Sequence, residues 1–489
     1  MSQSVNKLAF AAIVLAMLPA VLDQTILATA LPTVATELGH LTDVAWVVTA
    51  YVVAAAAATP LWGKLGDRHG RKLLLEVSLA MFLGASALSG LAQDLTLLVL
   101  ARVAQGAAAG GLMTLAYAAV GDLVSPRERG RYQGYIAMTF AVATVIGPLI
   151  GGLLVDHASW RWVFYVNLPV GLVALAGLRL RLPATEVEPS DRALDVAGAL
   201  LLAGATTALM LACIWGGDRY AWDSPAIVGL GGAFLLLAGV LAIRERRAAD
   251  PIVPLGVLRR RAVAVSSAAL FLVTATMFSI TVFVPLLLQT TTGATPTEAG
   301  LVLVAMMVGI TLSTNLAGRS IERNGRYKRF PLAGLALIAI ALGLMAVLAG
   351  DPTRTGIAVS LVIFGLGFGM VGQVLTVAVQ NGVDRRDLGV AMAATTFFRA
   401  LGGAIGAAVL GAVFAARAGS AGAAGTIALG PAARADVIDG IQTVFLVAAP
   451  IALVALLVVL RLEEVPLQTA RESRVARVSA TRAPAGATR

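Results

Sequence analysis

The decapeptide GKLGDRHGRK (Gly63–Lys72) is a charged turn between two long apolar segments, and its layout returns 255 residues further along the chain. Two glycines, an acid and an arginine recur at the same spacing: Gly63, Asp67, Gly70 and Arg71 in the first copy, Gly318, Glu322, Gly325 and Arg326 in the second. Two further segments repeat at a similar offset, PRERG at Pro126–Gly130 with DRRDLG at Asp384–Gly389, and IGPLIGG at Ile146–Gly152 with ALGGAIG at Ala400–Gly406. Repeats at one offset predict two structurally related halves.

The composition is that of a membrane protein. Of the 489 residues, 58% are hydrophobic and 13% are charged, whereas a soluble domain is typically about 45–50% apolar. Many stretches reach about 20 residues without a charge, which is the length that a helix needs to cross a bilayer. The expected fold class is an all-α polytopic membrane protein with fourteen spans, at about 8–32, 45–64, 73–92, 95–118, 131–155, 161–180, 194–215, 225–243, 262–288, 297–317, 330–349, 355–378, 389–416 and 437–460.

The spans and the repeat together predict the domain organisation. Residues 1–190 form a first six-helix bundle and residues 255–461 a second, pseudo-symmetric one. Residues 191–254 hold a linker and two additional spans that have no counterpart in the repeat. Residues 462–489 are basic and low in apolar content, so we expect a disordered cytoplasmic tail.

The net charge of +10 is distributed according to the expected topology. With the N-terminus inside, thirty of the 37 Lys and Arg residues lie on the cytoplasmic side. Five lie outside and two, Arg102 and Arg399, lie within the membrane. This asymmetry follows the positive-inside rule, and it predicts that both termini are cytoplasmic. The basic excess therefore indicates contact with anionic membrane lipid rather than with nucleic acid.

Two ionisable residues are expected deep in the first half. Asp23 lies about 15 residues into the first span, far from either headgroup layer, where a charge is costly and is a functional candidate by default. Arg102 lies about seven residues from the external end of the fourth span, roughly 10 Å below the outer surface against roughly 15 Å for Asp23. This similar depth makes a direct or water-bridged pair possible. The alternative for Asp23 is a structural carboxylate satisfied by neighbouring hydroxyl groups.

Glycines mark close approaches of helices at two places. In the charged turn, Gly63 and Gly66 allow backbones to meet, and Asp67 can face the positive N-terminus of a following or neighbouring helix. In the fifth span, Pro148 removes a backbone hydrogen bond, and the glycines beside it permit a kink and close contact with a neighbour. Topological anchoring is the alternative for the turn, and packing alone is the alternative for the fifth span.

Other chemistries find little support in the sequence. Cys213 is the single cysteine, which excludes a disulfide framework and a cysteine metal cluster. No GxxxxGK[ST] loop occurs, so ATP hydrolysis is not expected. The three histidines, His40, His69 and His157, lie in loops or at helix ends without nucleophile–base or metal-ligand spacing. We therefore expect neither an enzyme nor a bound metal or cofactor. The first 20 residues could mimic a signal peptide, but the apolar run continues past Asp23.

Taken together, these motifs resemble the major facilitator superfamily, and in particular its fourteen-helix drug:proton antiporter branch. The resemblance covers about residues 8–460. GKLGDRHGRK is similar to the superfamily motif between the second and third helices. The branch is further resembled by LDQTILATALP in the first span, RVAQG in the fourth, GPLIGG in the fifth and WRWVFYVNLPVG (Trp160–Gly171) before the sixth. The last segment also suits an aromatic belt at the external membrane interface.

The resemblance implies roles for particular residues. Asp23, with Arg102 as its partner, would couple protonation to substrate release. The cytoplasmic gate motif would consist of Gly63, Gly66, Asp67, Gly70 and Arg71, and the antiporter motif of Gly147, Pro148, Gly151 and Gly152. Candidates for the substrate cavity are Gln105, Gln289, Gln373 and Phe397, although the pattern defines no single ligand-facing surface.

The function expected from the sequence is proton-driven export of amphipathic or hydrophobic small molecules by alternating access, as in multidrug efflux. The chain would act as a monomer in the cytoplasmic membrane of a bacterium, with the proton gradient as its energy source. An exporter of an endogenous lipid or secondary metabolite on the same scaffold is the alternative. A symporter is disfavoured by the glycine–proline motif of the fifth span, and a membrane enzyme or receptor by the lack of catalytic spacing.

Overall fold

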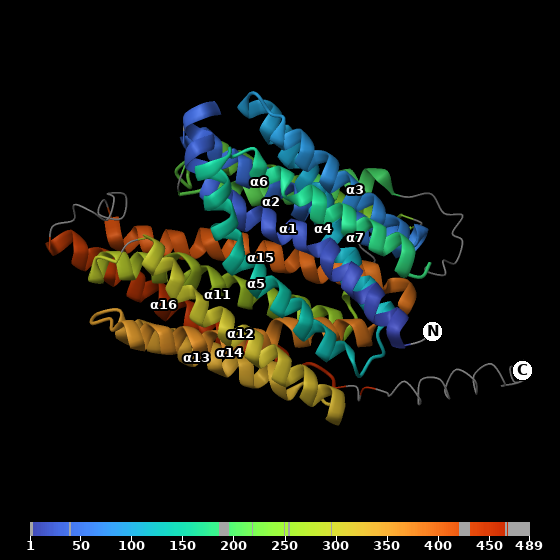
Figure 1. The fold of residues 1–489 in the computed structure, drawn as a ribbon. Coiled ribbons are helices and arrows are strands. Elements are labelled where there is room, and N and C mark those ends of the chain that lie inside the picture. Colours follow the sequence, from blue (N-terminus) through green and yellow to red (C-terminus); the bar gives the residue numbers. More distant parts are fainter. Residues whose placement is uncertain are drawn as a thin grey trace, which may run out of the picture.

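The protein is built almost entirely of α-helices in the part that the structure describes. The computed structural model describes residues 3–38, 41–184, 195–217, 219–248, 250–252, 255–294, 296–419, 431–464 and 467 (Figure 1). Fourteen helical segments among these residues are long and apolar enough to cross a membrane, which confirms the predicted number. The chain is thus a multi-pass membrane protein.

The elements follow the predicted order. The first half contains α1 (Gln3–Leu38), α2 (Leu41–His69), α3 (Arg71–Gly90), α4 (Leu95–Leu123), α5 (Arg129–His157), the short α6 (Trp162–Tyr165) and α7 (Asn167–Arg181). The inserted pair is α8 (Val196–Trp215) and α9 (Pro225–Glu245). The second half contains α10 (Leu255–Leu258), α11 (Arg261–Thr292), α12 (Pro296–Asn324), α13 (Arg329–Leu348), α14 (Arg354–Gly382), the 3-10 turn η1 (Arg385–Asp387), α15 (Leu388–Ala418) and α16 (Pro431–Leu460).

Several helices are longer than the spans predicted from hydropathy. α1 continues to Leu38, α12 to Asn324, and α16 begins at Pro431, so the predicted loop at 417–436 is too long. Hydropathy marks only the segment that lies in hydrocarbon, whereas the helix continues into polar sequence because each added turn satisfies more backbone groups. Residues 420–430 of that loop lie outside the described residues.

The packing of the two halves repeats. In the first half α2 packs on α4, α1 on α5 and α3 on α4; in the second, α12 packs on α14, α11 on α15 and α13 on α14. Between the halves, α2 lies against α15 and α5 lies against α12, which is again a matched pair of contacts. Figure 1 shows this exchange, with α5 reaching toward α12 and α15 lying along the first half. The internal sequence repeat thus corresponds to a repeat in packing.

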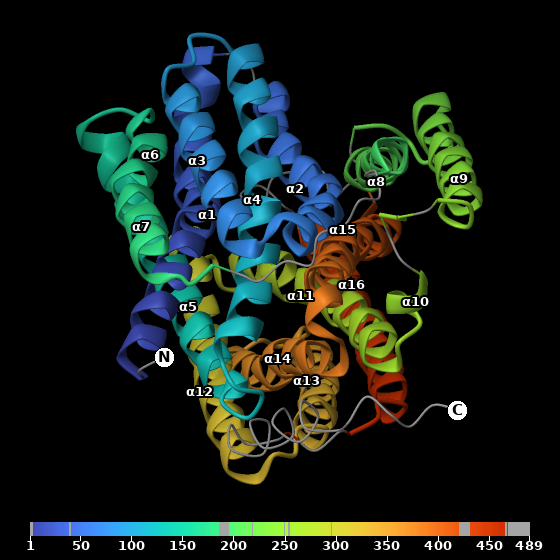
Figure 2. The same ribbon diagram turned by 90° about the vertical axis from the view of Figure 1, so that its right-hand side faces the viewer.

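The inserted helices lie beside one junction between the halves. α8 contacts α2 and α15 as well as α9 (Figure 2). Trp215 near the end of α8 packs edge-on against Trp46 of α2, with ring centroids 5.0 Å apart. The segment that leads back to the second half is held by an ion pair between Lys64 and Asp250, and Ile252 in this segment is buried. The boundary at 190–191 falls among residues outside the described ranges and stays a prediction.

One end of the molecule carries the charged turns, and we call it the basic end. The Gly70 turn between α2 and α3, the junction of α4 with α5, the start of α1 and the end of α16 all lie there (Figure 2). Just after α16, Leu462 and Leu467 are buried, and Leu467 donates its backbone N–H to the Gly325 carbonyl at 3.2 Å. The predicted disordered tail therefore does not begin at 462, because apolar contacts hold its first residues; residues 468–489 lie outside the described part.

Candidate functional site

The two deep charges of the first half form an ion pair. Nη1 of Arg102 on α4 lies 2.5 Å from Oδ2 of Asp23 on α1. Asp23 is fully buried and Arg102 is 1% exposed. Hence neither group faces lipid, and the structure brings together the two residues that the sequence places at similar depth. A guanidinium and a carboxylate tolerate such burial only when they are paired and hydrogen-bonded.

Amides complete the contacts of the carboxylate. Oδ1 of Asp23 accepts hydrogen bonds from Nε2 of Gln105 at 2.8 Å and from Nδ2 of Asn167 at 3.2 Å. Both amides also donate to the hydroxyl of Ser86, at 3.2 and 3.1 Å, and Ser86 donates to the Phe164 carbonyl. The alternative reading of Asp23, a carboxylate satisfied by hydroxyl groups, is not what the structure shows. α1, α3, α4 and α7 all meet in this network.

The guanidinium of Arg102 is held equally closely. Its Nε donates to the Val47 carbonyl at 3.2 Å, and its Nη1 donates to Oε1 of Gln105 at 2.7 Å. The ring of Tyr51 lies under it, with 4.2 Å between the guanidinium carbon and the ring centroid. Cation–π contact of this kind strengthens when the partners are desolvated. The pair is therefore fixed in position by α2 as well as by α1 and α4.

Sequence reasoning missed Asn167 and read its surroundings differently. We predict an aromatic belt at the external interface for Trp160–Pro169, but Trp160 is fully buried and donates its indole N–H to Glu37 at 2.8 Å, whereas Trp162 is 53% exposed. The buried rings of Trp160 and Phe164 instead pack with apolar residues of α1, and Asn167, which comes soon after them in the chain, contacts Asp23. A polar amide at the start of an apolar run was the one available signal.

The glycine–proline motif of α5 packs on the helix that carries Asp23. A side chain at Gly147 would meet Oγ1 of Thr25 at 2.1 Å, and one at Gly151 would meet Oγ1 of Thr29 at 2.3 Å. These two glycines therefore permit a close contact of α5 with α1; the sequence predicts a close contact with a neighbour but does not say which helix it is. Gly152 differs, because a side chain there would meet nothing within 4 Å. Pro148 lies inside the helix between them.

The charged turn joins the two halves at the basic end. Asp67 accepts hydrogen bonds from the backbone N–H groups of Gly389 and Val390, both at 2.8 Å, at the start of α15. The neighbouring helix whose positive N-terminus Asp67 faces thus belongs to the other half. This interaction adds the favourable helix dipole to two charge-assisted hydrogen bonds. A side chain at Gly63 would meet Cβ of Ala393 at 2.5 Å, so the helices touch there.

Arg71 connects Asp67 with two further groups. It donates to Oδ1 of Asp67 at 2.6 Å and to the Arg385 carbonyl at 2.5 Å, and it is paired with Asp122 of α4. Gly70 makes this possible, because it turns the chain from α2 into α3 with φ +92°, a conformation that favours glycine. Arg71 is 3% exposed and the Asp67 side chain 8%. We call Gly63, Gly66, Asp67, Gly70 and Arg71 the latch.

A second set of contacts lies beside the latch. Arg129 at the start of α5 donates to the Gln380 carbonyl at 2.6 Å and to Oδ1 of Asn381 at 2.7 Å, and Gln380 donates to the Tyr117 carbonyl at 2.8 Å. All hydrogen bonds and ion pairs described between the halves lie at the basic end, between residues 67–131 and 322–390. The structure is accordingly the form in which the halves are closed together at this end.

The four predicted cavity residues are not brought together. Gln105 is fully buried in the Asp23 network, where its amide is hydrogen-bonded to Asp23, Arg102 and Ser86. Gln289 lies near the outer end of α11, and Gln373 lies half-buried on α14. Of the four residues, Phe397 lines the apolar pocket described below. For Gln289 and Gln373 the role in substrate binding stays a prediction.

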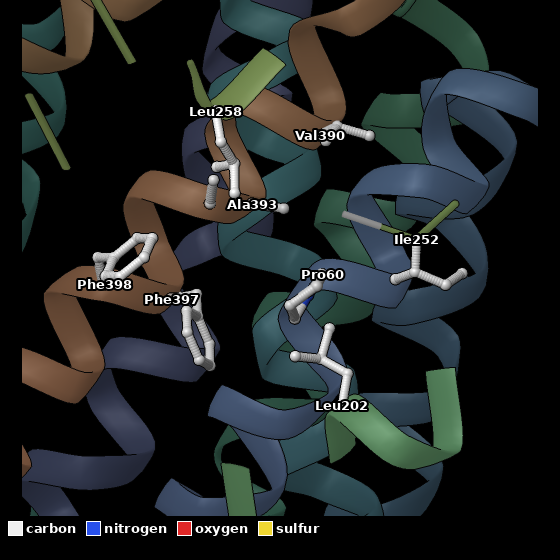
Figure 3. Close-up of a pocket in the computed structure, with 9 residues that line it drawn as sticks. Pro60, Leu202, Ile252, Leu258, Val390, Ala393, Phe397 and Phe398 are labelled. Carbon is white, nitrogen blue, oxygen red and sulfur yellow. The ribbon is translucent and has the colours of Figure 1, made fainter. Parts of the chain in front are cut away.

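The pocket at Phe397 lies between the halves, at the side that α8 covers. Pro60 of α2, Leu202 of α8, Ile252 of the returning segment and Phe397 and Phe398 of α15 contribute to its lining (Figure 3). Every lining residue is apolar, and the pocket encloses about 420 Å³ including its open mouth. An entirely apolar wall suits an acyl or aromatic group better than a charged one.

These features define a class of protein. Two bundles with repeated packing, joined at one end and holding a buried ion pair, are the architecture of a membrane transporter. No cluster of potential metal ligands occurs among the described residues. The family model described as "Major Facilitator Superfamily" matches residues 13–407. The chain belongs to the major facilitator superfamily, and it is therefore a transporter rather than an enzyme.

Relatives and solved structures agree with this family. An uncharacterised MFS-type transporter of Mycobacterium tuberculosis is 38% identical over 479 residues, covering 94% of this chain and 69% of the relative. The multidrug transporter protein MdtP of Bacillus subtilis is 34% identical over 418 residues, covering 86% and 77%. The solved proton:xylose symporter XylE, 14% identical, matches with a TM-score of 0.69 over 97% of this chain and 100% of that one, which supports the fold alone.

Proposed function

We propose that this transporter exports amphipathic or hydrophobic compounds in exchange for protons, by alternating access. The observation that carries the proposal is Asp23, an acid 16 residues inside the spanning segment Lys7–Leu38 and enclosed by Arg102, Gln105 and Asn167. Intramembrane carboxylates of this kind are typical of proton relays. The relationship to multidrug transporters supports efflux as the direction of transport. The basic end would be the cytoplasmic one.

The contacts suggest how protonation would be linked to movement. Ionised Asp23 holds α1, α4 and α7 together, and protonation would remove the charge that Arg102 balances. α1 contacts α5 through Thr25 and Thr29, and α5 in turn contacts α12 of the second half. A change at Asp23 would therefore reach the junction between the halves through packed helices. Proton and substrate would each shift the equilibrium by binding one form better than the other.

The test uses purified protein in proteoliposomes with an imposed pH gradient. We expect Asp23→Asn to lose gradient-driven efflux of an amphipathic dye, because the amide cannot take up and release a proton as a carboxyl group can. Exchange of the dye without a gradient should persist, which shows that the variant is folded. Asp156→Asn is the matched control, since Asp156 is exposed near the end of α5. Undiminished gradient-driven transport by Asp23→Asn would remove Asp23 from the mechanism.

A second candidate is export of an endogenous lipid or secondary metabolite. The apolar pocket at Phe397 favours it, because the pocket opens between α2, α8 and α15 rather than among polar residues. The same proteoliposomes can compare a phospholipid that carries a fluorescent acyl chain with a soluble dye. Transport of the lipid alone, reduced by Phe397→Ala, would favour this candidate over multidrug efflux.

A further inference from the structure

The second half contains a membrane arginine whose surroundings differ from those of Arg102. Arg399 lies on α15, eleven residues after Leu388, which corresponds to about 16 Å along the helix. Its Nη2 donates to Oγ1 of Thr376 on α14 at 3.3 Å. Its Nε is buried and has no hydrogen-bond partner in the described structure. No carboxylate of the described residues forms an ion pair with it, whereas Arg102 has Asp23.

The middle parts of the helices of the second half also contain no acid that could pair with Arg399. α11, α13, α14 and α15 contain no Asp or Glu. The acids of α12, Glu298 and Glu322, lie near its two ends, and those of α16, Asp436 and Asp439, lie near its start. Arg399 is half-buried with its Nε enclosed, and such a guanidinium without a counter-charge is unfavourable in a medium of low dielectric constant. An anionic group of a bound ligand would supply the missing counter-charge.

Neighbouring residues of α15 and the contact with Thr376 give the direction of the Arg399 side chain. Along α15, Met392 and Thr395 precede Arg399 on the same face, and both are 1% exposed. The lateral pocket is instead lined by Phe397 and Phe398, while Gly402 packs on the backbone of Phe271 in α11. Arg399 consequently points toward α14, on the inner side of α15.

Neighbouring groups on α14 extend the site. Gln373 lies one turn from Thr376 on the same face, it is half-buried, and its Oε1 is buried without a hydrogen-bond partner. Two turns beyond Thr376, about 12 Å along the helix, the half-buried ring of Phe368 stacks on Phe364, with centroids 6.2 Å apart and planes 19° apart. α14 thus carries a pair of stacked aromatic rings, Phe364 and Phe368, and, about two turns away, polar groups next to the guanidinium of Arg399.

We propose that Arg399, Thr376 and Gln373 form a binding site for the anionic group of an amphipathic organic anion, whose apolar part lies along α14 toward Phe368. A carboxylate, sulfonate or phosphate would occupy the free donor positions of the guanidinium, which forms charge-assisted and often bidentate bonds with such groups. The inference rests on the proposed export function and adds to it a charge preference. Asp23 and Arg102 take no part in it, because their contacts are already complete.

The test compares two dyes with the same aromatic scaffold. 8-Anilinonaphthalene-1-sulfonate carries a sulfonate, and N-phenyl-1-naphthylamine is its neutral counterpart. Binding to purified protein is measured by titration calorimetry, with empty detergent micelles subtracted. We expect Arg399→Gln to weaken binding of the sulfonate about tenfold or more, as is usual for loss of a charged hydrogen bond, and to change binding of the neutral dye less than about twofold.

Controls separate the site from general charge effects. Arg417→Gln removes the same charge from the exposed end of α15, and it should leave both dyes unaffected. Arg399→Lys keeps the charge but not the planar fork, so part of the sulfonate affinity should remain. If Arg399→Gln does not yield folded protein, Arg399→Lys and Thr376→Val decide, and both should weaken the sulfonate selectively. The proposal would be overturned if Arg399→Gln weakened binding of both dyes equally or left the affinity for the sulfonate unchanged. It would also be overturned if equimolar inorganic sulfate displaced the sulfonate dye.

Transport experiments distinguish this inference from the proposed function. Asp23→Asn should stop gradient-driven movement of both dyes, whereas Arg399→Gln should stop only that of the sulfonate. If the unmodified protein moves neither dye with a pH gradient, proton-coupled export fails. The binding comparison needs no gradient, so it still decides whether Arg399 recognises anions.

Discussion

The charged turn of the first half and its counterpart in the second half share a spacing of glycines and charges but not an environment. Both bring glycine against glycine between the halves: Gly63 lies against Gly389, and Gly318 lies against Gly130. Both also turn the chain at a glycine of positive φ, +92° at Gly70 and +67° at Gly325. The backbone part of the repeat is therefore preserved in each half.

The charged part of the repeat is not preserved. Asp67 and Arg71 are 8% and 3% exposed; Asp67 binds the start of α15 and Arg71 binds the Arg385 carbonyl of η1. Glu322, in contrast, lies 3.7 Å from Arg131 with 30% and 48% exposure. A buried pair is expensive to break, since removing one partner costs about 3–5 kcal/mol, while an exposed pair contributes about 0–1 kcal/mol. The junction between the halves is thus symmetric in packing and asymmetric in electrostatics, with the strong contact on the side of α2 and α15.

The comparison is tested most directly by neutralising each acid. We expect Asp67→Asn to destabilise the form closed at the basic end by about 3 kcal/mol, at the low end of the buried-pair range because Arg71 keeps Asp122. Glu322→Gln should change it by less than about 1 kcal/mol. Spin labels at the exposed His69 and Arg386, in a Cys213→Ser background, report the separation of the halves.

The expected readout is a population shift. About 3 kcal/mol corresponds to roughly a hundredfold change in the ratio of closed to open molecules, which is visible as a second, longer distance between the labels. Equal effects of the two substitutions would contradict the asymmetry. So would an effect of Glu322→Gln alone.

The shared packing gives the next prediction, in which the two halves should behave alike. Alanine at Gly63 would place Cβ 2.5 Å from Cβ of Ala393, and alanine at Gly318 would place it 2.4 Å from the Gly130 carbonyl oxygen. We expect each substitution to cost about 1–3 kcal/mol in the closed form, as overpacking does. The labels at His69 and Arg386 should report a similar opening for both.

Gly152→Ala is the matched control for these substitutions. It also changes a membrane glycine to alanine, but a side chain there meets nothing within 4 Å. The distance between the labels should remain that of the unmodified protein. A strong effect of Gly63→Ala with none of Gly318→Ala would mean that packing too is asymmetric.

The sequence predicts the features that depend on hydropathy, on spacing along the chain and on depth within a span. Fourteen spans follow from hydropathy, the two halves from the 255-residue offset, and the meeting of Asp23 and Arg102 from their similar depth. The expectation that Asp67 faces a helix N-terminus agrees with its contacts to Gly389 and Val390. Each of these rests on hydropathy, on spacing along the chain, on depth within a span or on local charge, and all of these can be read from the sequence.

Features that depend on the rotation of a helix about its axis could not be predicted. Lipid is as apolar as the interior of the bundle, so a membrane helix carries only a weak pattern to distinguish its two faces. This explains why Gln105 and Phe397, both assigned to one substrate cavity, lie in the Asp23 network and in a lateral pocket. Partners distant in sequence, such as Asp122 for Arg71 and Asp250 for Lys64, are fixed only by how the helices and the returning segment pack together.

The smallest effect is expected where the chain beside the latch is held by exposed charges. Arg260 donates to Asp384 at 2.8 Å and to Asp387 at 3.0 Å. The hydrogen bond from Arg260, and then its charge, lower the pKa of Asp384 below the ordinary 3.8. A carboxyl whose pKa is lower in the folded state contributes stability above its unfolded pKa and loses it as the pH falls through the folded value.

Asp384→Asn should therefore lower the melting temperature at neutral pH by no more than about 1–2 °C, because the side chain is exposed. The difference from the unmodified protein should shrink as the pH falls below 3.8, where Asp384 itself becomes protonated. Asp351→Asn is the control, an exposed acid after α13, and should show no such convergence. If Asp384→Asn lowered the melting temperature as much as Asp67→Asn does, exposed charges would also hold the halves together. The contrast between a buried latch and its solvent-exposed counterpart would then no longer explain the junction.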